Sequence, residues 1–117
     1  SSMAGLKGLP GAAAYSASKH GLIGLIRGLS EDFMGQPYTF NALCPAYVDT
    51  PIVDRPVVTI AEKTGRSEED APKILVNANR HRRLIHVDEI AAVSRWLTSE
   101  GSGSVNGQCI EIAGGQM

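Results

Sequence analysis

The sequence lacks the features that mark several large classes of protein. Its 11 basic and 12 acidic side chains leave a net charge of −1, and this balance argues against a domain that binds DNA or RNA through phosphate contacts. Its longest apolar-rich stretch, residues 21–29, is interrupted by Arg27 and is far shorter than the roughly 20 residues needed to span a bilayer. We therefore expect neither a nucleic acid nor a membrane among its partners.

Cysteine is also scarce. Cys44 and Cys109 are the only two, which is too few for a disulfide framework, and no C-x-x-C or H-x-x-x-H spacing suggests a metal site. No positively charged segment followed by an apolar one marks a secretory signal. We therefore expect a cytoplasmic protein without a bound metal.

What the sequence does contain is an alternation of helices and strands. Hydrophobic residues make up 43% and charged residues 20% of the chain, proportions typical of a folded domain. The patterns predict a helix over 15–34, a strand over Tyr38–Cys44, short helices within 57–86 that start at Ser67, a helix capped by Asp88 and a strand over Cys109–Ile112. Strands separated by helical segments pair in parallel, and two strands are too few for a complete sheet. We expect residues 1–117 to be a single partial domain of the α/β class.

The predicted helix over 15–34 has two opposite faces. At about 100° per residue, one stripe begins with Tyr15 and Lys19 and continues with apolar side chains. The apolar members of this stripe are Leu22, Ile26, Leu29 and Phe33. If these apolar turns lie on a sheet, Tyr15 and Lys19 lie on the same wall, at the rim of that sheet.

The other face of this helix carries small residues. They are Ala17, Gly21, Gly24 and Gly28. An interior glycine costs a helix about 1 kcal/mol relative to alanine, so three of them on one face suggest that another backbone approaches closely. That backbone belongs either to the same chain or to a helix of a second subunit, and the sequence leaves both alternatives open.

The most specific motif joins the start of the chain to this helix. Tyr15 follows Ser2 by thirteen residues and Lys19 follows Tyr15 by four, in the contexts SSMAG and YSASK. Y-x3-K alone would be a weak signal, because chance matches are frequent. The gap and the two contexts together closely resemble the active-site region of the short-chain dehydrogenase/reductase family.

The resemblance extends over essentially the whole chain. Residues 41–51 are similar to the family's N-x-x-x-P-G-x-V-x-T-P loop, the segment from Asp88 to its seventh helix, and residues 107–115 to its closing strand. Ala46 and Ala113 depart from the family's usual glycine and aspartate. The family's Gly-rich phosphate loop has no counterpart in this sequence. The resemblance therefore implies the C-terminal half of a Rossmann-type doubly wound parallel sheet.

The resemblance also implies three catalytic residues. Tyr15 would exchange a proton with the substrate oxygen, and Ser2 would hydrogen-bond that oxygen and hold it near the transferring hydride. Lys19, one helical turn from Tyr15, would favour the phenolate form and bind the nicotinamide ribose. Taken singly, Tyr15 is more simply a packing residue and Lys19 a solvated one, but the whole motif favours the catalytic interpretation.

The resemblance implies NAD or NADP as cofactor. Besides Tyr15 and Lys19, the residues expected to contact the cofactor are Pro45, Ala46, Tyr47, Val48 and Thr50. The first four would line the nicotinamide side, and Thr50 would bond the carboxamide or phosphate region. The alternative for Thr50 is a plain turn residue before Pro51.

The implied function is that of an NAD(P)-dependent oxidoreductase that interconverts a secondary alcohol and a ketone by hydride transfer. We expect a small-molecule hydroxy or keto substrate and a homodimer or homotetramer. Residues 50–69 resemble members that act on 3-hydroxyacids or 3-hydroxyacyl thioesters. The alternative is a non-catalytic truncated fragment that only self-associates or pairs with its missing N-terminal half. In either case we expect the isolated 117-residue chain to be inactive.

Overall fold

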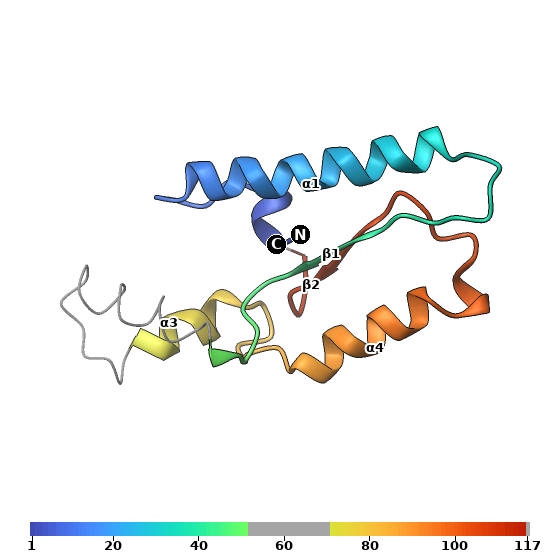
Figure 1. Ribbon diagram of the computed structural model, residues 1–117. Coiled ribbons are helices and arrows are strands. Elements are labelled where there is room, and N and C mark those ends of the chain that lie inside the picture. Colours follow the sequence, from blue (N-terminus) through green and yellow to red (C-terminus); the bar gives the residue numbers. More distant parts are fainter. Residues whose placement is uncertain (52–70, 117) are drawn as a thin grey trace.

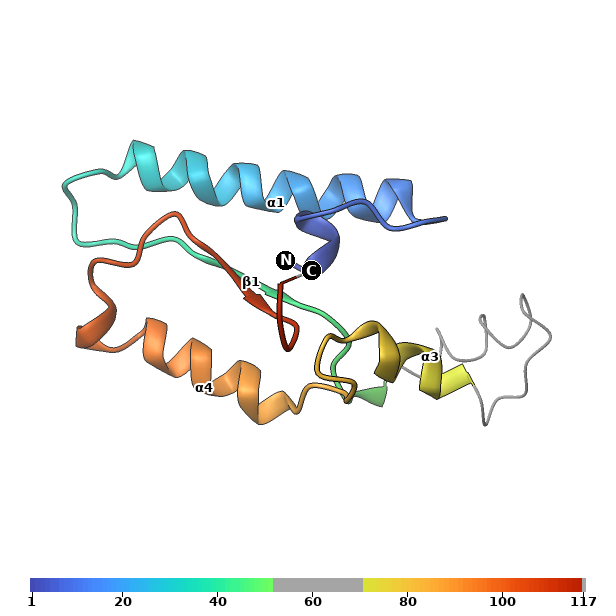
Figure 2. The same cartoon turned by 180° about the vertical axis from the view of Figure 1, so that it is seen from behind.

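Two parallel strands form the centre of the structure, with a long helix on each side. The computed structural model describes residues 1–51 and 71–116, so the helix start predicted at Ser67 lies outside the described residues. The elements are η1 (Met3–Gly5, a 3₁₀ turn), α1 (Ala13–Asp32), β1 (Ala42–Pro45), α3 (Ala71–Ala78), α4 (Val87–Leu97), η3 (Glu100–Ser102, a second 3₁₀ turn) and β2 (Cys109–Ile112). Figures 1 and 2 show α1 and α4 on opposite faces of the sheet. This layering confirms the predicted α/β class.

The register of the sheet brings the carboxyl ends of both strands to one edge. β1 and β2 pair in parallel, with Ala42 opposite Cys109 and Pro45 opposite Ile112. α1 runs back along the sheet, so its first turns lie toward the carboxyl ends of the strands (Figure 1). In open α/β sheets this edge is where ligands bind. No helix within residues 1–51 and 71–116 is long and apolar enough to cross a membrane.

The core lies between α1 and the sheet. Ile23 of α1 packs with Ala42 and Cys44 of β1, and Ile26 and Cys109 extend the cluster. Burying one isoleucine side chain contributes roughly 1.5–3 kcal/mol. Small side chains on β1 thus let the helix approach the sheet closely.

The face that α1 turns to the sheet is rotated from the predicted one. The buried residues of the helix are Ser16, Ile23 and Ser30, whereas Leu22, predicted to be buried, is 40% exposed. One residue corresponds to a turn of about 100° around the axis. The prediction was therefore wrong for Leu22, whose place on the sheet is taken by Ile23, whereas Ile26 of the predicted stripe does pack against the core.

The strand after α1 starts later than predicted. The parallel ladder begins at Ala42, and the residues before it make other contacts. Phe40 donates its N–H to Asn106 Oδ1 at 2.8 Å, and the rings of Tyr38 and Phe40 lie 5.7 Å and 5.5 Å from the ring of Phe33. The aromatic residues thus cover the end of α1 instead of joining the sheet, whereas β2 has the predicted bounds, Cys109–Ile112.

α4 begins one residue before the predicted cap. His86 is the N-cap, and Asp88 lies within the first turn. Glu89 Oε2 accepts the N–H of His86 at 2.8 Å, and the two acidic residues of the first turn lie near the positive end of the helix dipole. The helix therefore starts with a glutamate closing back on its cap, not with an aspartate as the cap.

Candidate active site

Tyr15 and Lys19 lie one turn apart at the start of α1, as their spacing predicts. The ammonium nitrogen of Lys19 lies 5.3 Å from the centre of the Tyr15 ring, the geometry of a cation–π contact. Tyr15 is 48% exposed. The segment before the helix is held to its first turn, because Ser16 Oγ accepts the N–H of Leu9 at 3.2 Å. The phenol of Tyr15 and the ammonium of Lys19 thus lie on one accessible face of α1, which we call the wall of α1.

Ser2 is held beside this wall by the N-terminal turn. Its hydroxyl accepts the N–H of Ala4 at 3.2 Å and caps η1, and Ser1 Oγ donates to the carbonyl of Lys19 at 3.1 Å. A Cβ on Gly5 would lie 2.9 Å from that same carbonyl, so only glycine lets η1 approach α1 this closely. The structure brings the Ser2 segment against the turn that carries Lys19, while the Ser2 hydroxyl is engaged by η1 itself.

The loop after β1 is held by main-chain hydrogen bonds. Ala46 donates its N–H to Ile112 at 2.9 Å, Ile85 donates to Tyr47 at 3.0 Å, and Asp49 donates to Ile85 at 2.8 Å. Val48 forms a parallel bridge with Ile85. The residues predicted for the nicotinamide side, from Pro45 to Val48, therefore form one continuous and firmly held stretch.

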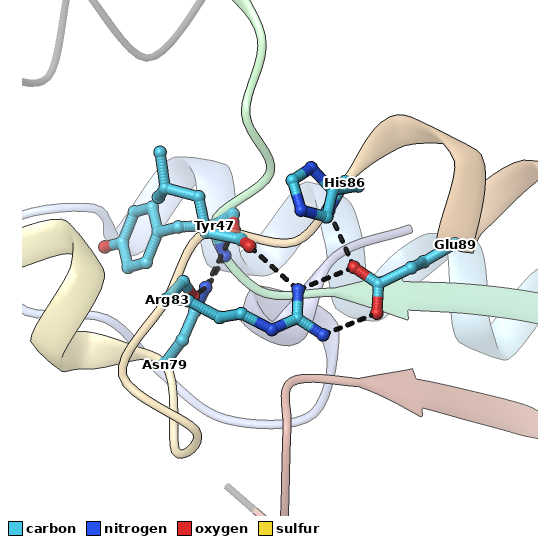
Figure 3. Close-up of polar contacts among 6 residues, drawn as sticks. Tyr47, Asn79, Arg83, His86 and Glu89 are labelled. Atoms are coloured by element: carbon cyan, nitrogen blue, oxygen red, sulfur yellow. Dashed lines mark hydrogen bonds and ion pairs between the residues drawn. The ribbon is translucent and has the colours of Figure 1, made fainter.

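Tyr47 adds a second phenol to the site. Burial raises the pKa of the Tyr47 phenol, and a negative charge on nearby Tyr15 would raise it further. The two tyrosines therefore lie within electrostatic range of each other, although they come from different elements. Figure 3 shows the Tyr47 ring directed away from the Arg83–Glu89 pair that supports its loop from behind. Because its pKa is raised, the Tyr47 phenol remains protonated at neutral pH.

Thr50 offers a polar group without a protein partner. Its hydroxyl is buried and makes no hydrogen bond within the described parts of the chain. A buried hydroxyl left unpaired costs about 1–3 kcal/mol. A ligand with an amide or phosphate group next to Thr50 would remove that cost. The donor set of this edge thus fits a nicotinamide cofactor.

Known proteins match this arrangement over nearly the whole chain. A family profile described as enoyl-(acyl carrier protein) reductase matches residues 1–117. The acetoacetyl-CoA reductase of Shinella zoogloeoides is 37% identical over 99% of this chain, and the D-beta-hydroxybutyrate dehydrogenase of Rhizobium meliloti is 28% identical over 95%. The crystal structure of the F189W actinorhodin polyketide ketoreductase with NADPH covers 98% of this chain with a TM-score of 0.93 and 30% identity.

The chain belongs to the short-chain dehydrogenase/reductase family. It covers 44% of the acetoacetyl-CoA reductase, 43% of the hydroxybutyrate dehydrogenase and 44% of the actinorhodin ketoreductase. The chain therefore spans less than half the length of these short-chain dehydrogenase/reductase proteins, and its fold is that of the Rossmann-type members.

One departure from the usual family sequence is harmless here. Ala46 stands where glycine is usual, but among the described non-glycine residues only Arg82 has a positive φ, at 57°. The backbone of Ala46 is thus one that any residue adopts. Alanine therefore leaves the loop of this short-chain dehydrogenase/reductase unstrained.

Sequence reasoning missed Asn79. Its side chain is fully buried and bonds the main chain of Tyr47. In the sequence, only the position of Asn79 after a helical segment could have pointed to its role. This signal is weak, since a polar residue there more often ends a helix or starts a turn. Only the meeting of two segments 32 residues apart reveals its role.

Proposed function

We propose that the protein is an NAD(P)-dependent oxidoreductase that interconverts a secondary alcohol and a ketone, and that residues 1–117 are the C-terminal half of its subunit. One observation carries this proposal. Tyr15 and Lys19 share an accessible wall at the sheet edge where the loop to Thr50 presents a buried, unpaired hydroxyl. We infer that this pair exchanges the proton and that the loop binds the cofactor.

The chemistry of Tyr15 is proton transfer. When a ketone is reduced, the phenol of Tyr15 gives its proton to the carbonyl oxygen; when an alcohol is oxidised, the phenolate takes that proton back. Lys19 stabilises the phenolate by its positive charge. Ser2 donates a hydrogen bond to the same substrate oxygen and holds it in line.

The cofactor-binding role falls to the loop and to Lys19. When bound, the nicotinamide ring supplies or accepts the hydride. Thr50 donates to the carboxamide or phosphate region, Lys19 binds the ribose hydroxyls, and the stretch from Pro45 to Val48 excludes water from one side of the ring. The NADPH in the actinorhodin ketoreductase structure supports a dinucleotide of this kind.

The substrate class we propose is a 3-hydroxyacid or a 3-hydroxyacyl thioester. The names of two relatives, acetoacetyl-CoA reductase and D-beta-hydroxybutyrate dehydrogenase, support it. The segment that resembled such enzymes, residues 50–69, lies almost entirely outside the described residues. The relatives therefore carry this part of the proposal.

The test is binding and turnover by the full-length protein. We expect the fluorescence of NADH or NADPH to change on titration, and acetoacetyl-CoA or acetoacetate to be reduced with loss of the reduced cofactor. Binding without turnover would leave the cofactor role and overturn the substrate class. Absence of binding to both cofactors would overturn the enzyme and favour the non-catalytic alternative.

We also propose a cytoplasmic homodimer or homotetramer. The two free cysteines support a reducing compartment. An added Cβ on Gly21, Gly24 or Gly28 would meet nothing within 4 Å, so no described part of this chain packs on the small-residue face of α1. We propose that a second subunit, and not another part of the same subunit, packs there. Light scattering of Gly24→Arg should show a smaller assembly than the wild type, and an unchanged mass would contradict this interface.

A further inference from the structure

Asn79 is a buried polar side chain near the proposed site whose amide oxygen and nitrogen are both hydrogen-bonded. It follows α3 directly and is 0% exposed. Its Oδ1 accepts the N–H of Tyr47 at 2.9 Å, and its Nδ2 donates to the carbonyl of Tyr47 at 2.8 Å and to the carbonyl of Arg83 at 2.7 Å. Both hydrogens of the amide are used, so loss of the amide group would remove three hydrogen bonds to the main chain.

These bonds give the loop the partner that the sheet no longer provides. β1 ends at Pro45, and two residues later the amide of Asn79 pairs with both the N–H and the C=O of Tyr47, as a neighbouring strand would. Ile85 donates a second bond to the same carbonyl at 3.0 Å. The backbone of Tyr47 is therefore fixed from two sides, and Figure 3 shows Asn79 placed against it.

The turn that follows Asn79 is held in place by hydrogen bonds, and an ion pair connects it to α4. Arg82 donates its N–H to the carbonyl of Asn79 at 3.0 Å and adopts a φ of 57°, which closes a tight turn. Arg83 then forms two bonds of 2.8 Å with the Glu89 carboxylate of α4. This chain of contacts ties the loop after β1 to α4 on the far face of the sheet, not to the helix that carries Tyr15.

We propose that Asn79 is a positioning residue for cofactor binding. By fixing both main-chain groups of Tyr47, it sets the path of the loop from Pro45 to Thr50 against the nicotinamide. Asn79 touches neither cofactor nor substrate. The inference rests on the proposed function, since it needs a nicotinamide on this loop.

The test substitutes Asn79→Asp in the full-length protein. The carboxylate keeps the shape and the acceptor for the Tyr47 N–H, but it replaces the NH2 group that donates both hydrogen bonds with a single oxygen that faces the carbonyls of Tyr47 and Arg83. We expect the dissociation constant of the reduced cofactor to rise about tenfold. The milder Asn79→Ser variant, which introduces no charge, should raise it about threefold.

Asn41→Asp is the matched control for a merely structural effect. Asn41 makes a comparable clamp at the other end of the strand pair, donating to the carbonyl of Val105 at 2.9 Å and accepting the N–H of Gln108 at 3.0 Å. This variant should lower the melting temperature yet leave the cofactor dissociation constant of the folded protein unchanged.

The outcomes separate the two proposals. Cofactor binding by the wild type with weaker binding in the Asn79 variants alone supports the positioning role. Dissociation constants within about twofold of wild type in the folded Asn79→Asp protein, or in Asn79→Ser if the first variant does not fold, overturn it. Equal weakening by Asn41→Asp also overturns it. If the wild type binds neither NADH nor NADPH, the proposed function fails and the positioning role fails with it.

Discussion

The two sides of the proposed site differ in how completely the described chain builds them. The loop after β1 is fixed through its main chain, with Tyr47 bonded by Asn79 and Ile85. The wall on α1 is open, because Tyr15 is 48% exposed and contacts the ammonium of Lys19 through its ring face. Hydrogen bonds between main-chain groups need only neighbouring segments, whereas a closed reaction site needs every segment that lines it and its ligand. The loop therefore has its final conformation in the described chain, and the side chain of Tyr15 remains exposed.

The largest effect is expected from a substitution of Tyr15 on the exposed face of α1. Tyr15→Phe in the full-length protein should lower kcat by about 10²–10⁴-fold, because the proton-exchanging oxygen is lost. Its cofactor dissociation constant should stay within about twofold, because in the proposed function the loop would make most of the nicotinamide contacts. Steady-state kinetics and fluorescence titration measure the two quantities.

Tyr38→Phe provides the control for this substitution. Tyr38 is also exposed, at 54%, and packs on Phe33 at the far end of α1, so loss of its hydroxyl should leave kcat unchanged. A Tyr15→Phe protein with more than about a tenth of the wild-type rate, a barrier change under about 1.4 kcal/mol, would rule out Tyr15 as the acid–base group.

The second prediction asks whether the preformed loop binds cofactor by itself. Residues 1–117 alone should bind NADH and NADPH at least about a hundredfold more weakly than the full-length protein and show no turnover, because a helix N-terminus normally holds the diphosphate and supplies much of the affinity. Isothermal titration of a preparation with verified mass and circular dichroism measures this. Micromolar affinity of the isolated chain would show that the loop after β1 and the face of α1 are sufficient for cofactor binding.

The third prediction separates binding from stability at Thr50. Thr50→Val should raise the free energy of unfolding by about 1 kcal/mol, because it replaces a buried unpaired hydroxyl with a methyl group of similar size. The same change should weaken cofactor binding about fivefold, because the bond to the cofactor is lost. Denaturant unfolding and fluorescence titration report the two effects.

Thr98→Val is the matched control for Thr50. The hydroxyl of Thr98 donates to the carbonyl of Arg95 at 2.9 Å at the end of α4, so its loss should not stabilise the protein or alter cofactor affinity. If Thr50→Val destabilised the fold instead, its hydroxyl would have a protein partner and the cofactor role would lose its support.

The smallest expected effect concerns the anchor of the loop on α4. The hydrogen bonds from Arg83 and from the His86 N–H lower the pKa of Glu89 from 4.5 to about 2. Ionised Glu89 therefore contributes stability above pH 4.5, and that contribution is lost as the pH falls from 4.5 toward 2. Glu89→Gln should lower the melting temperature slightly at neutral pH, with the difference shrinking across that window.

Glu31→Gln, at the far end of α1, is the control for removing a surface carboxylate. It should leave the melting temperature at neutral pH unchanged. A Glu89→Gln protein whose melting temperature differs from wild type equally at all pH values would show that the ion pair does not stabilise the turn behind the loop. The exposed pair would then act only as a surface contact.

The motif and the order of elements could be predicted because they depend on local spacing. Tyr15 and Lys19 lie one turn apart on any helix, and β2 has the predicted bounds because a short apolar run between glycines has few alternatives. The start of β1 could not be predicted. The β-forming aromatics before Ala42 pack on Phe33 instead, and propensity alone does not distinguish a strand from a packed loop.

The sequence by itself determined the family, the pair on α1 and the alternation of helices and strands. Only the tertiary structure decided which side chains share the sheet edge. It placed Ile23 instead of Leu22 on the sheet, since the available surface fixes the rotation of a helix. It also joined Asn79 to Tyr47 across 32 residues. Local patterns specify what each element is, but contacts between distant segments arise only when packing brings their buried polar groups within hydrogen-bonding distance.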